Sequence, residues 1–214
     1  MTIPELQDIP GLIAPLGGAQ PLSVAVMVTS ADGRATVSGR VGALTGDADQ
    51  RVLLGVRELA AAVLVGGQTV RNEGYAELLA ADAQARRSAR GLPPEPDLLV
   101  FTRSADGLPP AARALEAPVD ESGHAQLAGC WREIRARHPQ GLIVCEGGPT
   151  LLGRLVAEQL LDQLVLCISP QLVAGEGKRL IEPSAPLPGF PVGLTPLAVA
   201  GERDFVFIRY GIGE

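Results

Sequence analysis

Two glycine-rich segments, each directly after a short apolar run, hold the residues best suited to chemistry. They read Val65-Gly66-Gly67-Gln68-Thr69 and Cys145-Glu146-Gly147-Gly148-Pro149-Thr150. Glycine lets the backbone approach a ligand closely, and the first turn of a following helix offers free N–H groups that suit phosphate. Thr69 and Thr150 can add hydroxyl donors. Together the segments predict a nucleotide or phosphate site, whereas each alone is equally typical of a tight connection. Neither matches GxGxxG or the phosphate loop with its lysine.

Two further polar stretches stand beside predicted elements. Thr29-Ser30-Ala31-Asp32-Gly33-Arg34 follows an apolar run, and Leu44-Thr45-Gly46-Asp47 precedes a helical pattern. Asp32 suits a turn in which its carboxylate bonds its own backbone, or it faces a ligand. Asp47, with Gln50 three residues on, is a candidate helix cap.

The elements that must position these residues alternate between apolar runs and helical patterns. We predict strands at 22–28, 62–65, 98–102, 142–145 and 164–169, and helices at 47–61 and 150–161 and around Leu127, Cys130, Trp131 and Ile134. Segments 194–200 and 204–210 read as an antiparallel hairpin around Phe205, Phe207 and Ile208, residues that suit either the core or a dimer interface.

The apolar strands lack polar alternation, which favours a sheet covered on both faces. The predicted fold class is therefore α/β, with a mixed, mostly parallel sheet, helices on both faces and a C-terminal antiparallel hairpin. Residues 1–20, rich in proline and glycine, read as an irregular arm, and residues 21–214 read as a single domain. The stretch 80–96 reads as a surface helix followed by a loop.

Composition narrows the class of protein. A net charge of −6 and a pI near 5.0 argue against a nucleic-acid partner, which needs a basic face. Three cysteines, Cys130, Cys145 and Cys167, fit neither a disulfide framework nor a zinc pattern, so we expect buried thiols and no metal. No apolar run reaches the length of a membrane span, and no signal peptide is evident, so we expect a soluble cytoplasmic protein with no membrane partner.

Several ordered motifs carry a resemblance to a known family. They are Ser30-Ala31-Asp32-Gly33-Arg34, Leu44-Thr45-Gly46, Arg57 in the next helix, Val65-Gly66-Gly67-Gln68-Thr69-Val70, Glu146-Gly147-Gly148-Pro149-Thr150-Leu151, Leu161-Asp162-Gln163-Leu164 and the run from Pro170 to Gly177. Residues 21–210 thereby resemble the riboflavin-biosynthesis, or pyrimidine, reductases, the family of the RibD C-terminal domain, with a dihydrofolate-reductase-like fold.

The resemblance implies an NADPH-dependent oxidoreductase that reduces the ribosylamino group of a phosphorylated aminouracil by hydride transfer to an imine carbon. It implies a homodimer and a small-molecule substrate. It places Asp32 and Glu146 at the reacting centre and Arg57 and Glu146 on the substrate. Its cofactor residues would be Val28, Ala43, Thr69, Glu73, Gly147, Gly148, Pro149, Thr150, Leu151, Leu152 and Gly153. We add Arg103, next to strand 98–102, as the partner of the adenosine 2′-phosphate.

The residues alone leave other roles open. Glu146 could instead bond the N–H groups of its own loop, and Arg57 could lie on a solvated helix face. The family's lysine on the first strand is Val26 here, and the basic residue that closes its D-P-x-L-T-V-R segment is missing after Glu73. Arg86, Arg87 and Arg90 are either substitutes for that cation or surface charges. Because this basic residue is missing, two alternatives stay open. One is a dihydrofolate- or pterin-type reductase, in which Tyr75 could stack on a ring. The other is a non-catalytic nucleotide-binding descendant of such a reductase.

Overall fold

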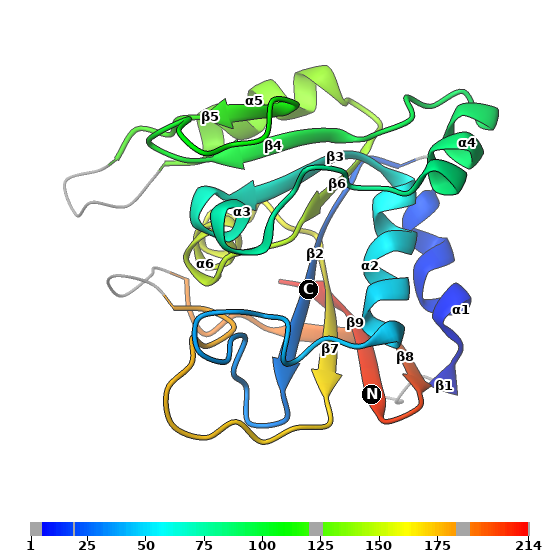
Figure 1. Cartoon of the computed structure of the whole chain (residues 1–214), viewed down its shortest axis with the longest axis vertical. Helices are drawn as coiled ribbons and strands as arrows, with labels where there is room; N and C mark the ends of the chain where they lie inside the picture. The colour runs from blue at the N-terminus through cyan, green and yellow to red at the C-terminus, as the bar shows by residue number, and fades with distance from the viewer. Residues whose placement is uncertain (1–5, 19, 120–125, 183–188, 214) are drawn as a thin grey trace.

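A computed structural model of the chain describes residues 6–18, 20–119, 126–182 and 189–213. Within them, nine strands form one sheet in the order β1-β8-β9-β7-β2-β6-β3-β4-β5 (Figure 1). The strands are β1 (Leu6–Gln7), β2 (Leu22–Ser30), β3 (Ala60–Gly66), β4 (Asp97–Phe101), β5 (Ala112–Leu115), β6 (Leu142–Cys145), β7 (Gln163–Ser169), β8 (Leu194–Glu202) and β9 (Phe205–Ile212). Only β9 pairs antiparallel, with β7 and β8, in this part of the chain. The predicted mixed, mostly parallel sheet with a C-terminal hairpin is confirmed.

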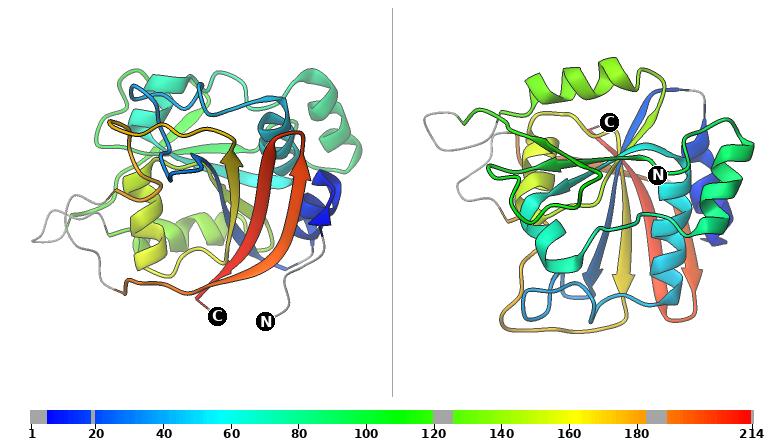
Figure 2. Two further views of the ribbon diagram at one scale, coloured as in Figure 1. Left: turned by 90° about the horizontal axis from the view of Figure 1, so that it is seen from below. Right: turned by 45° about the horizontal axis from the view of Figure 1, so that its top comes forward.

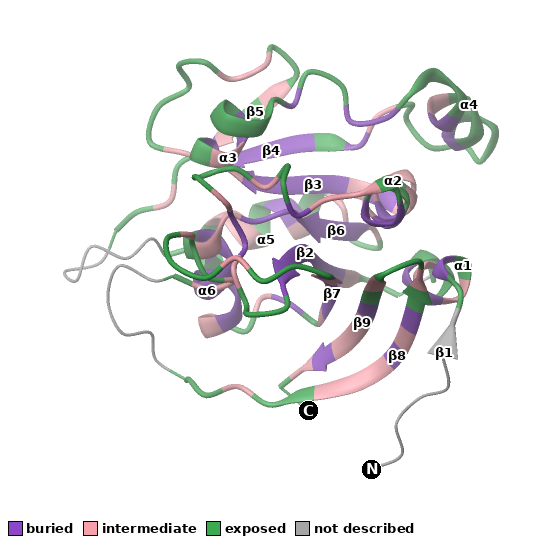
Figure 3. Cartoon of the chain, turned by 60° about the horizontal axis from the view of Figure 1, so that its bottom comes forward, coloured by how far each residue is buried: buried purple, intermediate pink, exposed green. Residues whose placement is uncertain are grey.

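Helices cover both faces of the sheet, as predicted. They are α1 (Ile9–Ile13), α2 (Asp47–Leu59), α3 (Gly67–Glu73), α4 (Ala81–Ala89), α5 (Ala128–Arg137) and α6 (Pro149–Ala157). Alternate residues of β2 enter two separate cores, because successive side chains of a strand point to opposite faces. Val24 and Val26 pack with residues of α1, α2 and α4, whereas Ala25 and Met27 pack with α5 and α6. Figure 3 shows the buried residues concentrated on the central strands.

The N-terminal segment differs from the predicted irregular arm. Residues 6–17 contain β1, α1 and a 3-10 turn (Ala14–Gly17). The Asp8 side chain accepts a hydrogen bond from Gly11 N at 2.8 Å and so caps α1. Ile9, Leu12 and Leu16 are buried, and their spacing of three and four residues is the helical period that the prolines and glycines obscured.

Element ends differ from prediction by a few residues. Helix α2 ends at Leu59 and not at Ala61, because β3 already begins at Ala60. Its N-cap is Gly46, with no side-chain capping bond, so the predicted capping role of Asp47 is wrong. In the hairpin, Phe207 is fully buried and stacks with Phe205 at 6.3 Å between ring centroids, so Phe207 belongs to the core.

The sheet divides at its centre, and this division positions the site. Strand β2 pairs with β6 only from Leu22 to Ala25, because β6 ends at Cys145. The remaining residues of β2, Val26–Ser30, continue beside β7 alone. Figure 2 shows β7, β8 and β9 curving away together with this end of β2. None of the helices in the described segments is long and apolar enough to cross a membrane.

Candidate functional site

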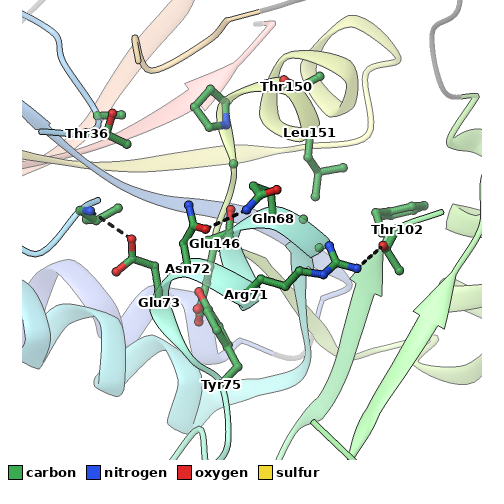
Figure 4. A pocket seen from close by; sticks show the side chains of 18 of the residues that line it. Thr36, Gln68, Arg71, Asn72, Glu73, Tyr75, Thr102, Glu146, Thr150 and Leu151 are labelled. Atoms are coloured by element: carbon green, nitrogen blue, oxygen red, sulfur yellow. Dashed lines mark hydrogen bonds between the residues drawn. The ribbon is translucent and has the colours of Figure 1, made fainter. Parts of the chain in front are cut away.

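A cavity of about 1200 Å³ lies where β2 separates from β6 (Figure 4). Its walls are the free end of β2, the segments that follow β3, β4 and β6, and one side of α2. Open α/β sheets bind ligands at the carboxyl ends of their parallel strands, and this cavity occupies that position. It is large enough for a dinucleotide together with a second small molecule.

The two glycine turns meet in this cavity. Gly66 N donates a hydrogen bond to Gly147 O at 2.8 Å. A methyl group added at Gly148 would lie 3.0 Å from Thr69 Oγ1, and one added at Gly67 would lie 2.7 Å from Thr102 Oγ1. The two turns therefore pack closely, with little room for a side chain at Gly148 or Gly67, and the Gly66–Gly147 bond joins their backbones.

The N-terminus of α6 lies at the same cavity. Gly148 is the N-cap, and Pro149, Thr150 and Leu151 of the first turn line the cavity. Their contact with a cofactor remains a prediction. The Thr150 hydroxyl is already engaged, because it donates to Glu182 O at 3.2 Å. Leu152 and Gly153 are buried within α6 and do not line the cavity, so their predicted contact with the cofactor is not supported. Gly147 does not line the cavity, and its carbonyl accepts the hydrogen bond from Gly66 N.

Arg57 and Glu146, the residue before Gly147, form a buried ion pair in the same cavity. Arg57 Nε and Nη2 donate to the two carboxylate oxygens of Glu146, each at 2.6 Å, and Nη1 donates to Leu78 O at 3.1 Å. Only 12% of the Arg57 side chain and 3% of the Glu146 side chain are exposed. Burial opposes the charge of Arg57, but its bonds to Glu146 outweigh burial and raise its pKa. The helix-face alternative for Arg57 and the own-loop alternative for Glu146 are therefore both wrong.

Tyr75 packs beside this ion pair, a role that its sequence position does not reveal. The Arg57 guanidinium lies 5.3 Å from the centroid of the Tyr75 ring, so the ring covers a cation of the chain itself. Burial, reinforced by the charge of Glu146, raises the pKa of the Tyr75 phenol well above its usual value. Tyr75 is therefore a neutral, packed side chain, and Figure 4 shows it pointing toward Glu146.

Asp32 and Ala43 lie outside the cavity lining. The Asp32 carboxylate accepts hydrogen bonds from Ser30 Oγ at 2.5 Å and from Val173 N and Ala174 N at 3.0 and 2.9 Å. These bonds, led by that from Ser30, hold the pKa of Asp32 well below its usual range. Asp32 fixes the loop after β7, and the structure does not bring it into the cavity with Glu146. Ala43 uses its carbonyl to accept from Gln171 Nε2 at 2.7 Å.

The other predicted residues, Val28, Thr69, Glu73 and Arg103, line the cavity. Glu73 also fixes its rim, because its Oε1 accepts from Val41 N at 3.1 Å. Arg103 is exposed and stands in the loop after β4.

Sequence reasoning missed Arg71, which holds the loop after β4. Its Nε donates to Asp106 O at 3.1 Å and its Nη2 to Ser104 O at 2.9 Å, with a further bond to Thr102 Oγ1. Arg71 comes two residues after Thr69 on α3, next to a motif already singled out. That position could have drawn attention to it.

Asp49 is the second missed residue. It is 6% exposed, lines the cavity and lies on the buried face of α2 with Val52 and Val56. Burial raises its pKa to about 6, against a smaller opposite effect of a hydrogen bond from the Cys167 thiol. Asp49 precedes Val52 by three residues and Val56 by seven, which places it on the apolar face of the helix. A carboxylate at such a position is the signal that could have identified it.

Cys145 and Cys167 are buried thiols whose pKa values are raised by that burial. The part of the chain that the structure describes contains no group of three or more His, Cys, Asp or Glu side chains able to hold a metal ion.

Comparison with known proteins agrees with this geometry. Residues 21–194 match the family model of the RibD C-terminal domain. A pyrimidine reductase-like protein from Corynebacterium diphtheriae shares 18% identity over 96% of this chain and 99% of its own, with a TM-score of 0.78. Acinetobacter baumannii RibD shares 16% identity over 92% of this chain, which spans 59% of that protein, with a TM-score of 0.71. Dihydrofolate reductase from Enterococcus faecalis, solved with NADP(H), shares 14% identity over 91% of this chain and 98% of its own, with a TM-score of 0.56.

At these identities the solved structures establish the fold alone. The search of curated proteins finds no match. The family match covers most of the chain and includes both glycine turns and the Arg57–Glu146 pair. The chain therefore belongs to the RibD C-terminal domain family and has a dihydrofolate-reductase-like fold.

Proposed function

We propose that this chain is an NADPH-dependent reductase that adds a hydride to the carbon of a carbon–nitrogen double bond in a small heterocyclic substrate. One observation carries the proposal: a single cavity brings the backbone wall of the two glycine turns within reach of the Arg57–Glu146 pair. The first feature suits a dinucleotide, and the second suits a polar substrate beside it.

The residues present fit NADPH in three places. The first turn of α6 offers backbone N–H groups and the positive end of its dipole to a diphosphate. Val28 and Thr69 line the same cavity and would contact the cofactor. Arg103, with Arg71 fixing the loop that carries it, offers a cation for the 2′-phosphate. When bound, NADPH would supply the hydride.

The substrate would lie between the cofactor and α2, where Asp49, Leu53, Arg57 and Tyr75 line the cavity. Arg57 and Glu146 neutralise each other, so together they form a fixed dipolar wall. Such a wall presents a fixed local dipole to a polar ring, because both side chains are held by each other.

Two substrate classes fit this proposal. The family resemblance favours the phosphorylated ribosylamino uracil, and the A. baumannii relative is named RibD. The second class, a pterin or dihydrofolate, is favoured by the state of Arg57. Its Nε and Nη2 bind Glu146 and its Nη1 binds Leu78 O, so it offers a phosphate little that is free.

The test is NADPH oxidation measured with the aminouracil phosphate and with dihydrofolate side by side. NADPH binding is measured separately by its fluorescence on titration with the protein. Micromolar binding with turnover of either substrate supports the proposal. Micromolar binding without turnover of either favours a non-catalytic nucleotide-binding protein, and no binding at millimolar NADPH contradicts both.

The family's homodimer remains a prediction for this chain. Sedimentation equilibrium at micromolar concentration distinguishes a dimer from the 22.2 kDa monomer.

A further inference from the structure

Asp49 differs from the other carboxylates that line the cavity. Glu146 is held by Arg57, Glu73 accepts from Val41 N, and Asp106 accepts from Ser104 Oγ in an exposed loop. Asp49 is buried in the first turn of α2, and across the described segments no ion pair neutralises it. A buried carboxyl group without a cation costs free energy as an anion, so its presence on a cavity wall calls for a reason.

Few ionisable groups surround Asp49. From β7 the Cys167 thiol donates a hydrogen bond to the Asp49 carboxyl group, which lowers its pKa. Burial has the larger effect and raises that pKa. Arg57 of the same helix is turned toward Glu146. Val26 and Val28 of β2 and Leu53 of α2 line the same cavity, together with the uncharged polar side chains of Thr45 and Gln50. This environment favours the neutral, protonated carboxyl group over the carboxylate.

We propose that Asp49 supplies the proton in the reduction, a role that rests on the proposed function. The hydride forms a C–H bond at the substrate carbon while the electrons of the C=N π bond move to nitrogen. The nitrogen takes the Asp49 proton and forms an N–H bond. NADPH is thereby oxidised, the substrate is reduced, and the Asp49 carboxylate regains a proton from water through the open cavity.

The other candidate acids on this wall are less suited. Both oxygens of Glu146 already accept hydrogen bonds from Arg57, each at 2.6 Å, so its carboxyl group faces the arginine. The Tyr75 phenol has a pKa far above neutrality. Asp32 lies outside the cavity lining and is held ionised by three donors. Asp49 combines burial, access to the cavity and readiness to be protonated near neutral pH.

The decisive variant is Asp49→Asn, which keeps the shape and removes the acidic proton. Its matched control is Asp47→Asn, the same change in the same turn of α2, where the side chain is 75% exposed. We expect Asp49→Asn to lower kcat by about 10²- to 10⁴-fold, with the NADPH dissociation constant unchanged, and Asp47→Asn to leave both unchanged. The wild-type kcat should fall tenfold per pH unit on the alkaline side, and this limb should be absent in Asp49→Asn.

A second readout is independent of activity. Infrared difference spectra of the NADPH-free protein, wild type minus Asp49→Asn, should show a protonated carboxyl band that titrates near pH 6. A carboxyl group already ionised at pH 4.5 overturns the proposal, as does normal turnover by Asp49→Asn. If the wild type reduces neither substrate, the proposed function fails, and the Asp49 role fails with it. Turnover by the wild type and by Asp49→Asn alike defeats the Asp49 role alone.

Discussion

The N–H group of Gly66 donates a hydrogen bond to the carbonyl of Gly147 across 2.8 Å, although the two residues lie in turns 81 positions apart. This bond joins the end of β3 to the loop after β6, so the two glycine turns form one continuous surface. Both residues joined by this bond are glycines, so the shape of the surface at this point is set by backbone atoms. We therefore expect substitutions at these glycines to lower ligand affinity more than they lower the stability of the fold.

Gly148→Ala tests this surface. The added methyl group would lie 3.0 Å from Thr69 Oγ1, and Gly148 itself lines the cavity. We expect NADPH affinity to fall by at least about tenfold, roughly 1.4 kcal/mol, measured by fluorescence titration. Gly129→Ala on α5 is the control, because nothing lies within 4 Å of its added methyl. Equal loss of affinity in both variants would contradict a local role for Gly148.

Glu146→Gln tests the buried ion pair. The change leaves the Arg57 guanidinium buried opposite a neutral amide, and removing one partner of a buried pair costs about 3–5 kcal/mol. We expect a lower urea midpoint together with loss of turnover. The matched control is Glu133→Gln, which breaks a 3.7 Å pair with Arg113 at the surface and should cost less than about 1 kcal/mol. Normal turnover by Glu146→Gln would remove Glu146 from the reacting centre.

Arg103→Ala and Arg71→Ala separate cofactor choice from loop structure. Arg103 is exposed at the cavity, and losing a charge-assisted bond to a 2′-phosphate costs about 1.5–3 kcal/mol. We expect Arg103→Ala to raise the KM for NADPH about 10- to 100-fold and to leave that for NADH unchanged. Arg71→Ala should raise both, because Arg71 holds the loop through Ser104 O and Asp106 O. An unchanged NADPH to NADH ratio in Arg103→Ala would show that another residue binds the 2′-phosphate.

The burial of Asp49 also has a cost in stability that depends on pH. Its pKa rises from an ordinary 3.8 to about 6 on folding, so the folded state binds more protons between these values. Stability should therefore fall as pH rises from about 4 to 6 and then level off. Asp49→Asn should be more stable than wild type at pH 8 by up to about 3 kcal/mol, with little difference at pH 4. Thermal unfolding at both pH values checks this, and Asp47→Asn should show no such pH dependence.

Most of the fold could be predicted from the sequence, because apolar residues recur at helical spacing in the helices and in unbroken runs in the buried strands. Unbroken apolar runs located β2, β3, β4, β6 and β7, and the glycines after β3 and β6 indicated a ligand site. The parallel strand β5 (Ala112–Leu115) was missed, because Arg113 interrupts its apolar run. The N-terminal segment was misread because its prolines and glycines concealed the spacing of Ile9, Leu12 and Leu16.

The site was predicted less completely, because the roles of its polar residues depend on distant partners. Nothing local in the sequence shows that Arg57 binds Glu146, 89 positions away, or that Val173 and Ala174 engage Asp32. Asp49 and Arg71 were missed for the same reason, since each acquires its environment from another element of the sheet.

The separation of β2 from β6 arises from unequal strand length, since Val26–Ser30 extend past the point where Cys145 ends its strand. The hollow between them thus follows from the lengths of two backbone strands. What the hollow accepts is decided afterwards, by the few side chains on its walls. A protein with only 18% of its residues in common has the same fold, so the side chains on these walls are where two such chains can differ most.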